Sequence, residues 1–442
     1  MSTSGSRARA SDRKAAATGA PPRSRFVRGS ILGAAVAQAS AQKLAVLAQQ
    51  PFRSLSDREQ AAQQLDDDLA RLLFQTCGTL RGAALKLAQA LATEQELVPE
   101  AYRTELARAS YRAPPIHRAL VQRILRGELG GLSLFHRFDL VPFAAASLGQ
   151  VHEATDHAGQ SLAVKIQYPG IAETITADFA LLRTALGPTR FSRVLASCSG
   201  ELLARLGEEL DYQCEAGHTG WFRDHLALPR VLVPRVHPAL TTRHVLTTDR
   251  LDGQHLDEWL AAGRSRMQRD SYGQLLVDLF HHCVFDLGRI HADPNPGNYL
   301  FRDDHQLALL DFGCVRAIEP GMAAAFQRLV AHPDPTPDTF VEMHSALGVH
   351  YRRDVPPGEL REFLRDWGAW LTAPYREPTF DFGESHEHFA RGATLGKAAH
   401  RFVDRYDGPF VYFARSHHGL LRLLQRLGAR VRLRRAALRT MA

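Results

Sequence analysis

The sequence contains no run of 18 apolar residues, and we therefore expect no helix that spans a membrane. Cysteine is scarce as well, and no two of the five cysteines form a C-x-x-C pair. This scarcity argues against a disulfide framework and against a zinc site, and it is typical of a protein in a reducing compartment. The remaining composition is ordinary for a globular protein, with 45% hydrophobic and 23% charged residues. A chain of 442 residues is long enough for two lobes with sizeable cores.

Lysine is also scarce. Only five lysines occur among the 54 lysine and arginine residues, and they are Lys14, Lys43, Lys86, Lys165 and Lys397. Where arginine is the default cation, a lysine in an apolar or motif context indicates that a compact ammonium group is needed. Lys86 and Lys165 stand in such contexts.

A net positive charge is missing from the middle of the chain. The formal net charge is +7, but residues 1–28 sum to +6 and residues 415–442 sum to +8, so the middle carries 7 − 14 = −7. A body of this charge is not typical of a nucleic-acid-binding surface, and we expect no nucleic-acid partner. Two interpretations of the basic ends stay open: they are solubilising tails, or they are patches that bind anionic lipid.

Periodicity divides the chain into five segments. Residues 1–29 predict a disordered basic arm, and the apolar stretch at 30–41 is too short and weak for a cleaved signal peptide. A helical pattern follows to about residue 127, then three short strands within 138–169, more helices, two strands and a largely helical second half. This order predicts an α+β protein with two lobes. The other predicted segments are a helical extension at 30–135, an N-terminal lobe with inserted helices at 136–252, a C-terminal lobe at 253–414 and a basic amphipathic helix at 415–442.

The last segment has an apolar stripe at helical spacing. Its arginines lie largely opposite this stripe, which is formed by Leu420, Leu424, Leu427, Val431 and Leu438. Two interpretations stay open: the helix packs on the C-terminal lobe, or it lies on a membrane surface. Both can hold for different turns.

Five residues occur in the order that phosphoryl transfer requires. The reaction needs a cation on the phosphates, oxygen ligands for magnesium and an acid that orients the nucleophile. "SLAVKIQYP" places Lys165 in a strand between apolar neighbours, and "DYQCEAGH" offers Glu215 as its ion-pair partner. "HADPNPGN" gives Asp293 and Asn298 five residues apart, and "LALLDFG" places Asp311 at the end of an apolar strand. These five residues predict a kinase-type site in which Asp293 orients the nucleophile and Asn298 and Asp311 bind magnesium.

Two features of ordinary protein kinases are absent. No G-x-G-x-x-G loop precedes the strand lysine, and Ala292 stands where the H-R-D triplet has arginine, which indicates no control by activation-loop phosphorylation. A second D-F-G copy at Asp381–Gly383 has no apolar strand before it and lies far beyond the catalytic loop. We interpret this second copy as chance.

Over roughly residues 30–430 the sequence resembles the UbiB/ADCK family of atypical kinase-like proteins. "RGAALKLAQ" resembles the family's K-x-G-Q motif, with Lys86 and Gln89 at its outer positions. "EELDYQCEA" resembles its E-x-D motif, at Glu209 and Asp211. "FAAASLGQVHEA" resembles the alanine-rich loop that stands where protein kinases have the glycine-rich loop, and it contributes Ala144, Ala145, Ala146 and Ser147. "AVKIQYPGI", "HADPNPGN" and "LDFG" complete the match.

The resemblance implies a bilobal protein-kinase-like α+β fold whose N-terminal helical extension covers the active site. It implies that ATP and Mg²⁺ bind, and that the chain supports ubiquinone (coenzyme Q) or related isoprenoid-lipid metabolism. The implied partners are an isoprenoid or phenolic lipid, an anionic membrane surface and coenzyme Q biosynthetic proteins. The implied location is cytoplasmic, peripheral on the inner face of the membrane. By the same resemblance, the catalytic residues are Asp293, Lys165 and Glu215. The cofactor-binding residues are those of the alanine-rich loop together with Lys165, Lys86, Gln89, Glu209 and Asp211. The metal ligands are Asn298 and Asp311.

Two positions depart from the family's pattern. Ala88 replaces the glycine of K-x-G-Q, which affects how closely that helix can approach another backbone. Glu209 and Asp211 would point about 200° apart on a regular helix. Either the helix is irregular there, or only one of the two carboxylates faces the site.

Two other functions stay open from the sequence. "HADPNPGN" also resembles the loop of small-molecule kinases of the aminoglycoside/choline type, although that class does not need the K-x-G-Q-like and alanine-rich segments. A non-enzymatic scaffold in which a nucleotide gates lipid binding would also retain the lysine and the metal ligands.

Overall fold

The computed structural model describes residues 25–49, 57, 61, 65, 68, 72, 76, 116–146, 148–169 and 207–434 of the chain. The chain forms two compact units. Unit 1 comprises Met1–Ala216 and Val236–Arg250, and unit 2 comprises Gly217–Arg235 and Leu251–Ala442.

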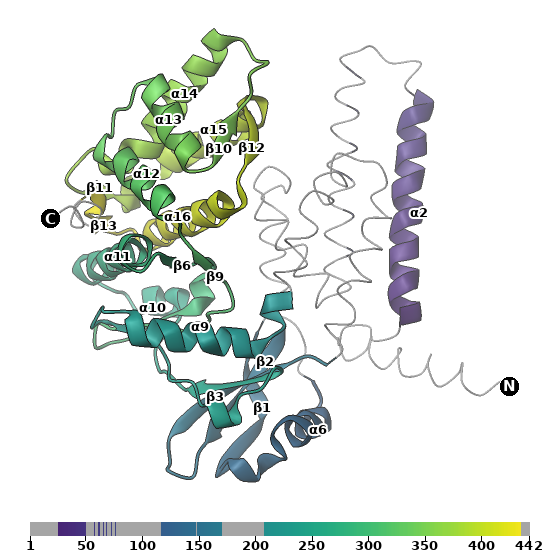
Figure 1. Ribbon diagram of the computed structural model, residues 1–442. Helices are drawn as coiled ribbons and strands as arrows, with labels where there is room; N and C mark the ends of the chain where they lie inside the picture. Colours follow the sequence, from purple (N-terminus) through teal and green to yellow (C-terminus); the bar gives the residue numbers. More distant parts are fainter. Residues whose placement is uncertain are drawn as a thin grey trace. The chain divides into compact units, whose positions relative to one another are not determined.

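Unit 1 contains a four-stranded antiparallel sheet. Its strands, in spatial order, are β1 (Arg137–Ala145), β2 (Gly149–Thr155), β3 (Ser161–Gln167) and β5 (Val245–Asp249). Helix α6 (Arg118–Leu129) lies beside this sheet (Figure 1) and buries Val121 and Leu125 against it. The same core contains alternate residues of β3, namely Leu162, Val164 and Ile166, as expected for a strand with one buried face. The three strands predicted within 138–169 are therefore confirmed.

Helix α2 (Arg25–Gln49) begins inside the segment predicted to be a disordered arm. The prediction of disorder over residues 1–29 is wrong for residues 25–29, which belong to this helix. They directly precede an alanine-rich stretch of high helix propensity, which favours extension of the helix towards its N-terminus. Within the described part of the chain, no helix is long and apolar enough to cross a membrane.

Unit 2 is mostly helical, and its described strands form three two-stranded sheets and one three-stranded sheet. Helix α9 (Tyr212–His225) begins in unit 1 and continues into unit 2. The other helices of unit 2 are α10 (Leu256–Ala261), α11 (Arg266–His281), α12 (Pro320–Ala331), α13 (Pro337–Ala346), α14 (Pro357–Thr372), α15 (His386–Phe402) and α16 (Gly408–Leu427). Its strands are β4 (Val231–Leu232), β6 (Arg289–His291), β7 (Tyr299–Phe301), β8 (Leu307–Leu309), β9 (Val315–Ala317), β10 (Val349–Tyr351), β11 (Phe380–Asp381), β12 (Val403–Tyr406) and β13 (Arg430–Val431).

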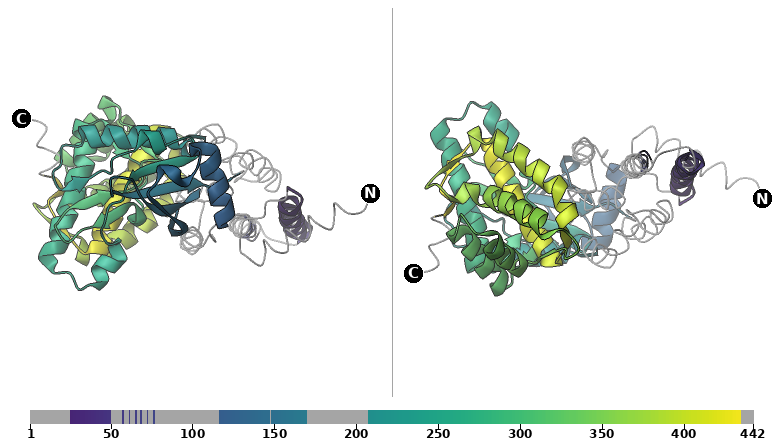
Figure 2. Two further views of the ribbon diagram at one scale, coloured as in Figure 1. Left: turned by 90° about the horizontal axis from the view of Figure 1, so that it is seen from below. Right: turned by 90° about the horizontal axis from the view of Figure 1, so that it is seen from above.

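Helices α11 and α16 lie side by side in the core of unit 2 (Figures 1 and 2). Close packing at this point requires Gly273, because a Cβ atom there would lie 2.5 Å from the Cβ of Ala429. Apolar side chains of α16 are buried completely or nearly so, including Leu420 at 5%, Leu424 at 0% and Leu427 at 0% exposure. The C-terminal apolar stripe is therefore part of the core over these turns.

The bounds of the last helix differ from the prediction of one helix over 415–442. The helix begins at Gly408 and ends at Leu427, because Gly428 takes a left-handed conformation (φ 58°) and its N–H caps the final carbonyl groups. Val431, predicted to continue the helical stripe, lies instead in strand β13 and is 1% exposed. Leu438 lies outside the described residues.

A few large apolar side chains of the described residues remain exposed. They are Leu44, Leu134, Val141, Phe143 and Met267. Val141 and Phe143 belong to β1, which forms one edge of the sheet in unit 1.

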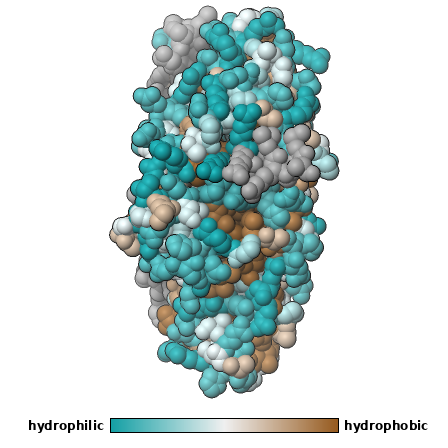
Figure 3. Space-filling view, turned by 90° about the vertical axis from the view of Figure 1, so that its left-hand side faces the viewer, coloured by the Kyte–Doolittle hydropathy of each residue, from teal (hydrophilic) through white to brown (hydrophobic). Residues whose placement is uncertain are grey.

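Figure 3 shows one face of the molecule, on which hydrophilic side chains cover most of the surface and apolar side chains gather near the centre and the lower edge.

Candidate active site

The lysine of the central strand forms a buried ion pair in unit 1. Lys165 lies on β3 between β2 and β5, and its Nζ atom lies 2.9 Å from Oε1 and 2.8 Å from Oε2 of Glu215. The two side chains are only 14% and 5% exposed. The ammonium group also lies 5.0 Å from the ring centroid of Tyr212, within the range of a cation–π contact. The structure thus brings together the predicted pair and adds an aromatic neighbour that the sequence reasoning missed.

The backbone is irregular between Glu209 and Asp211. Residues 207–209 are helical, Leu210 is a turn, and α9 begins only at Tyr212. Asp211 caps this new helix, because its Oδ1 accepts a hydrogen bond from the N–H of Gln213 at 3.0 Å. Of the two alternatives left open by the sequence, the irregular helix is therefore the one observed.

The alanine-rich loop joins β1 to β2 in unit 1. Ala144 and Ala145 end β1 and are exposed, and Ala146 donates a hydrogen bond from its N–H to the carbonyl of Gly149 at 2.9 Å. A Cβ atom at Gly149 would lie 2.2 Å from the carbonyl oxygen of Ile166, so this backbone passes too close to β3 for any side chain. Ser147 lies outside the described residues. The loop therefore ends beside Ile166, the residue that follows Lys165.

Two strand pairs in unit 2 bring its predicted site residues together. The catalytic loop (His291–Asn298) runs from the end of β6 to the start of β7, and the D-F-G loop (Leu310–Cys314) connects β8 to β9. Because β6 pairs with β9 and β7 pairs with β8, the two loops lie at the same end of both pairs. The loops are bonded directly as well, since Leu310 donates its N–H to the carbonyl of Asn298 at 3.0 Å and Ala292 donates to the carbonyl of Cys314 at 2.8 Å.

Asp293 has both carboxylate oxygens in hydrogen bonds. Nδ2 of Asn298 donates to its Oδ2 at 3.1 Å and to its backbone carbonyl at 3.0 Å. Nη2 of Arg415, from helix α16, lies 2.5 Å from Oδ1. Burial raises the pKa of the Tyr299 phenol, and the negative charge of Asp293 raises it further. Sequence reasoning missed Arg415 as a site residue, because it stands 122 positions after Asp293 and was assigned only to the basic C-terminal segment.

Asp311 is fixed by the backbone around it. Its Oδ1 accepts a hydrogen bond from the N–H of Gly313 at 2.9 Å, and its carbonyl is bonded to Nε2 of His291. The next residue, Phe312, is fully buried and packs against Phe222 of α9 with ring centroids 5.1 Å apart. This packing anchors the D-F-G loop in the core of unit 2.

The oxygen atoms of this loop pair fit a magnesium ion better than a transition metal. No group of three or more His, Cys, Asp or Glu side chains among the residues that the structure describes is placed to hold a metal. Magnesium is usually bound by one or two carboxylates together with substrate phosphates and water. The two hydrogen bonds of Asn298 use its amide nitrogen, and metal binding would use its amide oxygen together with the carboxylate of Asp311.

The second D-F-G copy takes part in structural ion pairs. Oδ2 of Asp381 lies 2.5 Å from Nη2 of Arg266 and 3.0 Å from Nη2 of Arg430. Burial raises the pKa of Asp381, but hydrogen bonds from the two arginines outweigh burial and the pKa is lowered overall. Its carboxylate therefore holds α11 to the C-terminal strand β13.

Several arginines of the basic C-terminal segment are bonded within unit 2. Arg415 pairs with Asp293, Arg426 with Asp257 and Arg430 with Asp381. Arg434 donates to the carbonyl of Ala331 at 3.3 Å. Much of the positive charge that made this segment look like a lipid-binding patch is thus bonded to groups of the same unit.

The K-x-G-Q-like residues Lys86 and Gln89 lie outside the described residues. The prediction that an N-terminal extension covers the active site therefore stays a prediction.

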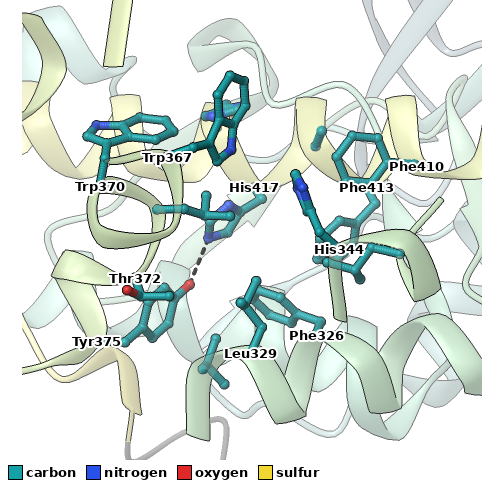
Figure 4. A pocket seen from close by; sticks show the side chains of 15 residues that line it. Phe326, Leu329, His344, Trp367, Trp370, Thr372, Tyr375, Phe410, Phe413 and His417 are labelled. Atoms are coloured by element: carbon teal, nitrogen blue, oxygen red, sulfur yellow. Dashed lines mark hydrogen bonds between the residues drawn. The ribbon is translucent and has the colours of Figure 1, made fainter. Parts of the chain in front are cut away.

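An aromatic cavity of about 50 Å³ lies between α12, α13, α14 and α16 in unit 2 (Figure 4). Its lining includes Phe326, His344, Trp367, Trp370, Tyr375 and His417. The Tyr375 hydroxyl and Nε2 of His417 are 2.7 Å apart, and burial lowers the pKa of His417 to about 3. His417 is therefore neutral at physiological pH. Aromatic side chains therefore surround α16 on the side of the helix that carries His417.

Comparison with known proteins agrees with this geometry. The ABC1 atypical kinase-like domain matches residues 108–333. The chain is 33% identical over 277 residues to an uncharacterized aarF domain-containing protein kinase, chloroplastic, of Arabidopsis thaliana, covering 60% of this chain and 38% of that protein. It is 37% identical over 247 residues to Protein ACTIVITY OF BC1 COMPLEX KINASE 3, chloroplastic, of Arabidopsis thaliana. This alignment covers 52% of this chain and 34% of that protein. It is 34% identical over 261 residues to Atypical kinase COQ8B, mitochondrial, of Rattus norvegicus. This alignment covers 56% of this chain and 48% of that protein.

A solved structure is similar over most of its length. It is the complex of Rv3197 with erythromycin from Mycobacterium tuberculosis, with 26% sequence identity, a TM-score of 0.60, and coverage of 87% of this chain and 98% of that chain. The curated relatives are longer proteins, and the alignments span only 34–48% of their length.

The strand lysine with its helical glutamate, and the paired catalytic and D-F-G loops, define a protein-kinase-like fold. The match over residues 108–333 covers just over half of the chain, and the chain belongs to the ABC1 atypical kinase-like family. The predicted relationship to the UbiB/ADCK family and the predicted kinase-like α+β fold are therefore confirmed.

Proposed function

We propose that this chain binds ATP with Mg²⁺ and acts as an ATPase or phosphotransferase. The observation that carries the proposal is the Lys165–Glu215 pair, with both contacts below 3 Å and both side chains largely buried. A buried carboxylate that presents an ammonium group from the central strand is the arrangement that kinase-like proteins use to hold nucleotide phosphates.

Each site residue has a role in this proposal. Lys165 holds phosphate oxygens and Glu215 orients its ammonium group. Asn298 and Asp311 supply magnesium ligands, and Asp293 accepts a hydrogen bond from the attacking water or hydroxyl group. The new bond joins that oxygen to the terminal phosphorus, the bond to the bridging oxygen breaks, ADP leaves, and the proton passes to Asp293 or to solvent.

We further propose that the substrate or effector belongs to ubiquinone or related isoprenoid-lipid metabolism at a membrane surface. Support comes from membership of the family that contains Atypical kinase COQ8B and the ACTIVITY OF BC1 COMPLEX KINASE proteins. Deletion of residues 435–442, which include Arg435 and Arg439, should weaken binding to anionic liposomes. A larger deletion from residue 419 would remove buried leucines of α16 and is not a usable test.

One experiment tests the enzymatic proposal. Magnesium-dependent ADP release is measured with and without anionic liposomes and with phenolic or isoprenoid lipids, for the natural chain and for Asp293→Asn. We expect ADP release from the natural chain and a loss of at least about 100-fold in the variant, since a positioned acid or base contributes about 10²–10⁴-fold. ATP binding without ADP release under every condition would instead support the non-enzymatic scaffold. Robust phosphorylation of choline or an aminoglycoside would support the small-molecule kinase.

A second candidate function is macrolide binding. It is favoured by the Rv3197–erythromycin complex, because that chain is covered over 98% of its length by this one. Titration calorimetry with erythromycin, with and without Mg–ATP, tests it. Heat of binding that saturates at one site supports this candidate, and its absence up to millimolar erythromycin rejects it.

A further inference from the structure

Helix α16 contacts the catalytic loop at three places. Nη2 of Arg415 lies 2.5 Å from Oδ1 of Asp293, and Oγ of Ser416 donates to the carbonyl of His291 at 3.2 Å. One turn later, a Cβ atom at Gly419 would lie 2.0 Å from Cγ of Pro294, so glycine permits the closest approach of helix and loop. These contacts fix the loop from its first residue to the residue after Asp293.

The helix that presents Arg415 is itself held firmly. Ser416 and His417 are 3% and 4% exposed, and Leu420 and Leu424 belong to the main core. Aromatic side chains of the cavity in Figure 4 enclose the helix near His417. A side chain on such an element has a well-defined origin, which is the condition for precise placement of a functional group.

The catalytic loop has no lysine or arginine between Asp293 and Asn298. The residues between Asp293 and Asn298 are Pro294, Asn295, Pro296 and Gly297. Phosphoryl transfer concentrates negative charge, and positive groups that are fixed in advance stabilise it. Arg415 places a guanidinium group, which stays charged at all physiological pH values, directly beside Asp293.

We propose that Arg415 is the positioning residue for Asp293. It holds Oδ1 of the carboxylate while Asn298 holds Oδ2, so the carboxylate has one orientation and a permanent positive charge next to it. This inference rests on the proposed function, in which Asp293 orients the nucleophile. It adds a residue from the C-terminal helix to a site otherwise built from strand ends and loops.

The test compares Arg415→Gln and Arg415→Lys in steady-state ADP release, with Arg422→Gln as the control. Arg422 lies on the same helix about two turns after Arg415, is exposed, and contacts Gln425 and Phe389, so its variant removes the same charge at a different place on the helix. We expect Arg415→Gln to lower kcat about 10- to 100-fold, in line with the effect of small misplacements of a catalytic group, while KM for ATP stays within about threefold. Arg415→Lys should recover part of kcat, and Arg422→Gln should match the natural chain.

A double variant separates positioning from a general effect on folding. In an Asp293→Asn background, Arg415→Gln should lower kcat no further, because the carboxylate that it positions is gone. Equal losses in both backgrounds, or full activity of Arg415→Gln, would overturn the proposal.

A second readout does not depend on turnover. The thermal unfolding midpoints of the natural chain, both single variants and the double variant form a cycle that measures the coupling of Arg415 to Asp293. We expect the decrease caused by Arg415→Gln to shrink in the Asp293→Asn background and at 1 M salt. Additive decreases would reject the pair itself. Coupling in this cycle, together with no ADP release from the natural chain, would reject the enzymatic proposal and leave the pair intact.

Discussion

Lys165 and Glu215 are fifty residues apart in the sequence, and their side chains meet at 2.8 Å in a largely buried ion pair. Removal of one partner from such a pair leaves the other charge without its compensation, which destabilises proteins by about 3–5 kcal/mol. We expect Lys165→Met to lose stability of this order in urea unfolding and to lose Mg–ATP binding. The double variant Lys165→Met with Glu215→Met should recover most of the stability but none of the binding. Equal stability of the single and the double variant would contradict this account.

The two D-F-G copies provide a matched pair of substitutions. Asp311→Asn should abolish magnesium-dependent ATP binding, because it removes the charge of the carboxylate that we propose as a metal ligand. Asp381→Asn should leave ATP binding unchanged and lower the free energy of unfolding by about 1–2 kcal/mol, since its carboxylate bonds Arg266 and Arg430. Titration calorimetry and urea unfolding of both variants check the two expectations. A loss of ATP binding in Asp381→Asn would refute the structural role given to the second copy.

Glycine at the contact between α16 and the catalytic loop is predicted to be essential. Gly419→Ala forces Pro294 or the helix to move, and overpacking of this kind costs about 1–3 kcal/mol. We expect lower stability together with lower kcat in ADP release. Gly396→Ala on α15 is the control, because a Cβ atom there meets nothing within 4 Å. The control should gain about 0.5–1 kcal/mol from helix propensity and keep its activity.

Acid is predicted to destabilise unit 2 through buried histidines. Burial lowers the pKa of His281 and His344 to about 3, and both rings are neutral in the folded state. Well above pH 6.5 the folded and unfolded states bind equal numbers of protons at these rings. As the pH falls from 6.5 towards 3, only the unfolded state gains protons, so each histidine removes up to about 1.4 kcal/mol of stability per pH unit.

His281 gives this prediction its sharpest test. Neither ring nitrogen has a hydrogen-bond partner among the described residues, and phenylalanines surround the ring. His281→Phe should therefore flatten the dependence of the urea midpoint on pH between 7.5 and 5. The control is exposed His386→Gln, which should keep the slope of the natural chain. An unchanged slope in His281→Phe would contradict the assignment.

Local patterns in the sequence predicted the parts of the site that lie in single elements. Alternation around Lys165 identified a strand, and the five-residue interval identified Asp293 and Asn298. The tertiary partner of Asp293 was not predictable in the same way, because the arginines of α16 share one helical pattern and only packing distinguishes Arg415 from Arg422. Which turn of a helix contacts a loop that lies far earlier in the sequence depends on tertiary packing and not on spacing.

The bounds of α16 were predictable from signals that the periodicity argument did not use. Asp407 precedes the helix as its N-cap residue, Pro409 stands in its first turn, and Gly428 follows its last residue. These residues mark a helix over 408–427, whereas the apolar stripe by itself continued to Leu438. The stripe is real, but strand β13 continues it with Val431 after the helix has ended.

The contact between Arg415 and Asp293 also has a consequence for the order of events during synthesis. Arg415 is translated 122 residues after Asp293, which corresponds to roughly 6–24 s at typical elongation rates of about 5–20 residues per second. Throughout this interval the loop that carries Asp293 has emerged without the helix that holds it. A nascent chain therefore contains Lys165, Asn298 and Asp311, the residues proposed to bind nucleotide and metal, well before Asp293 acquires its arginine, and the last of these groups to be put in place comes from α16.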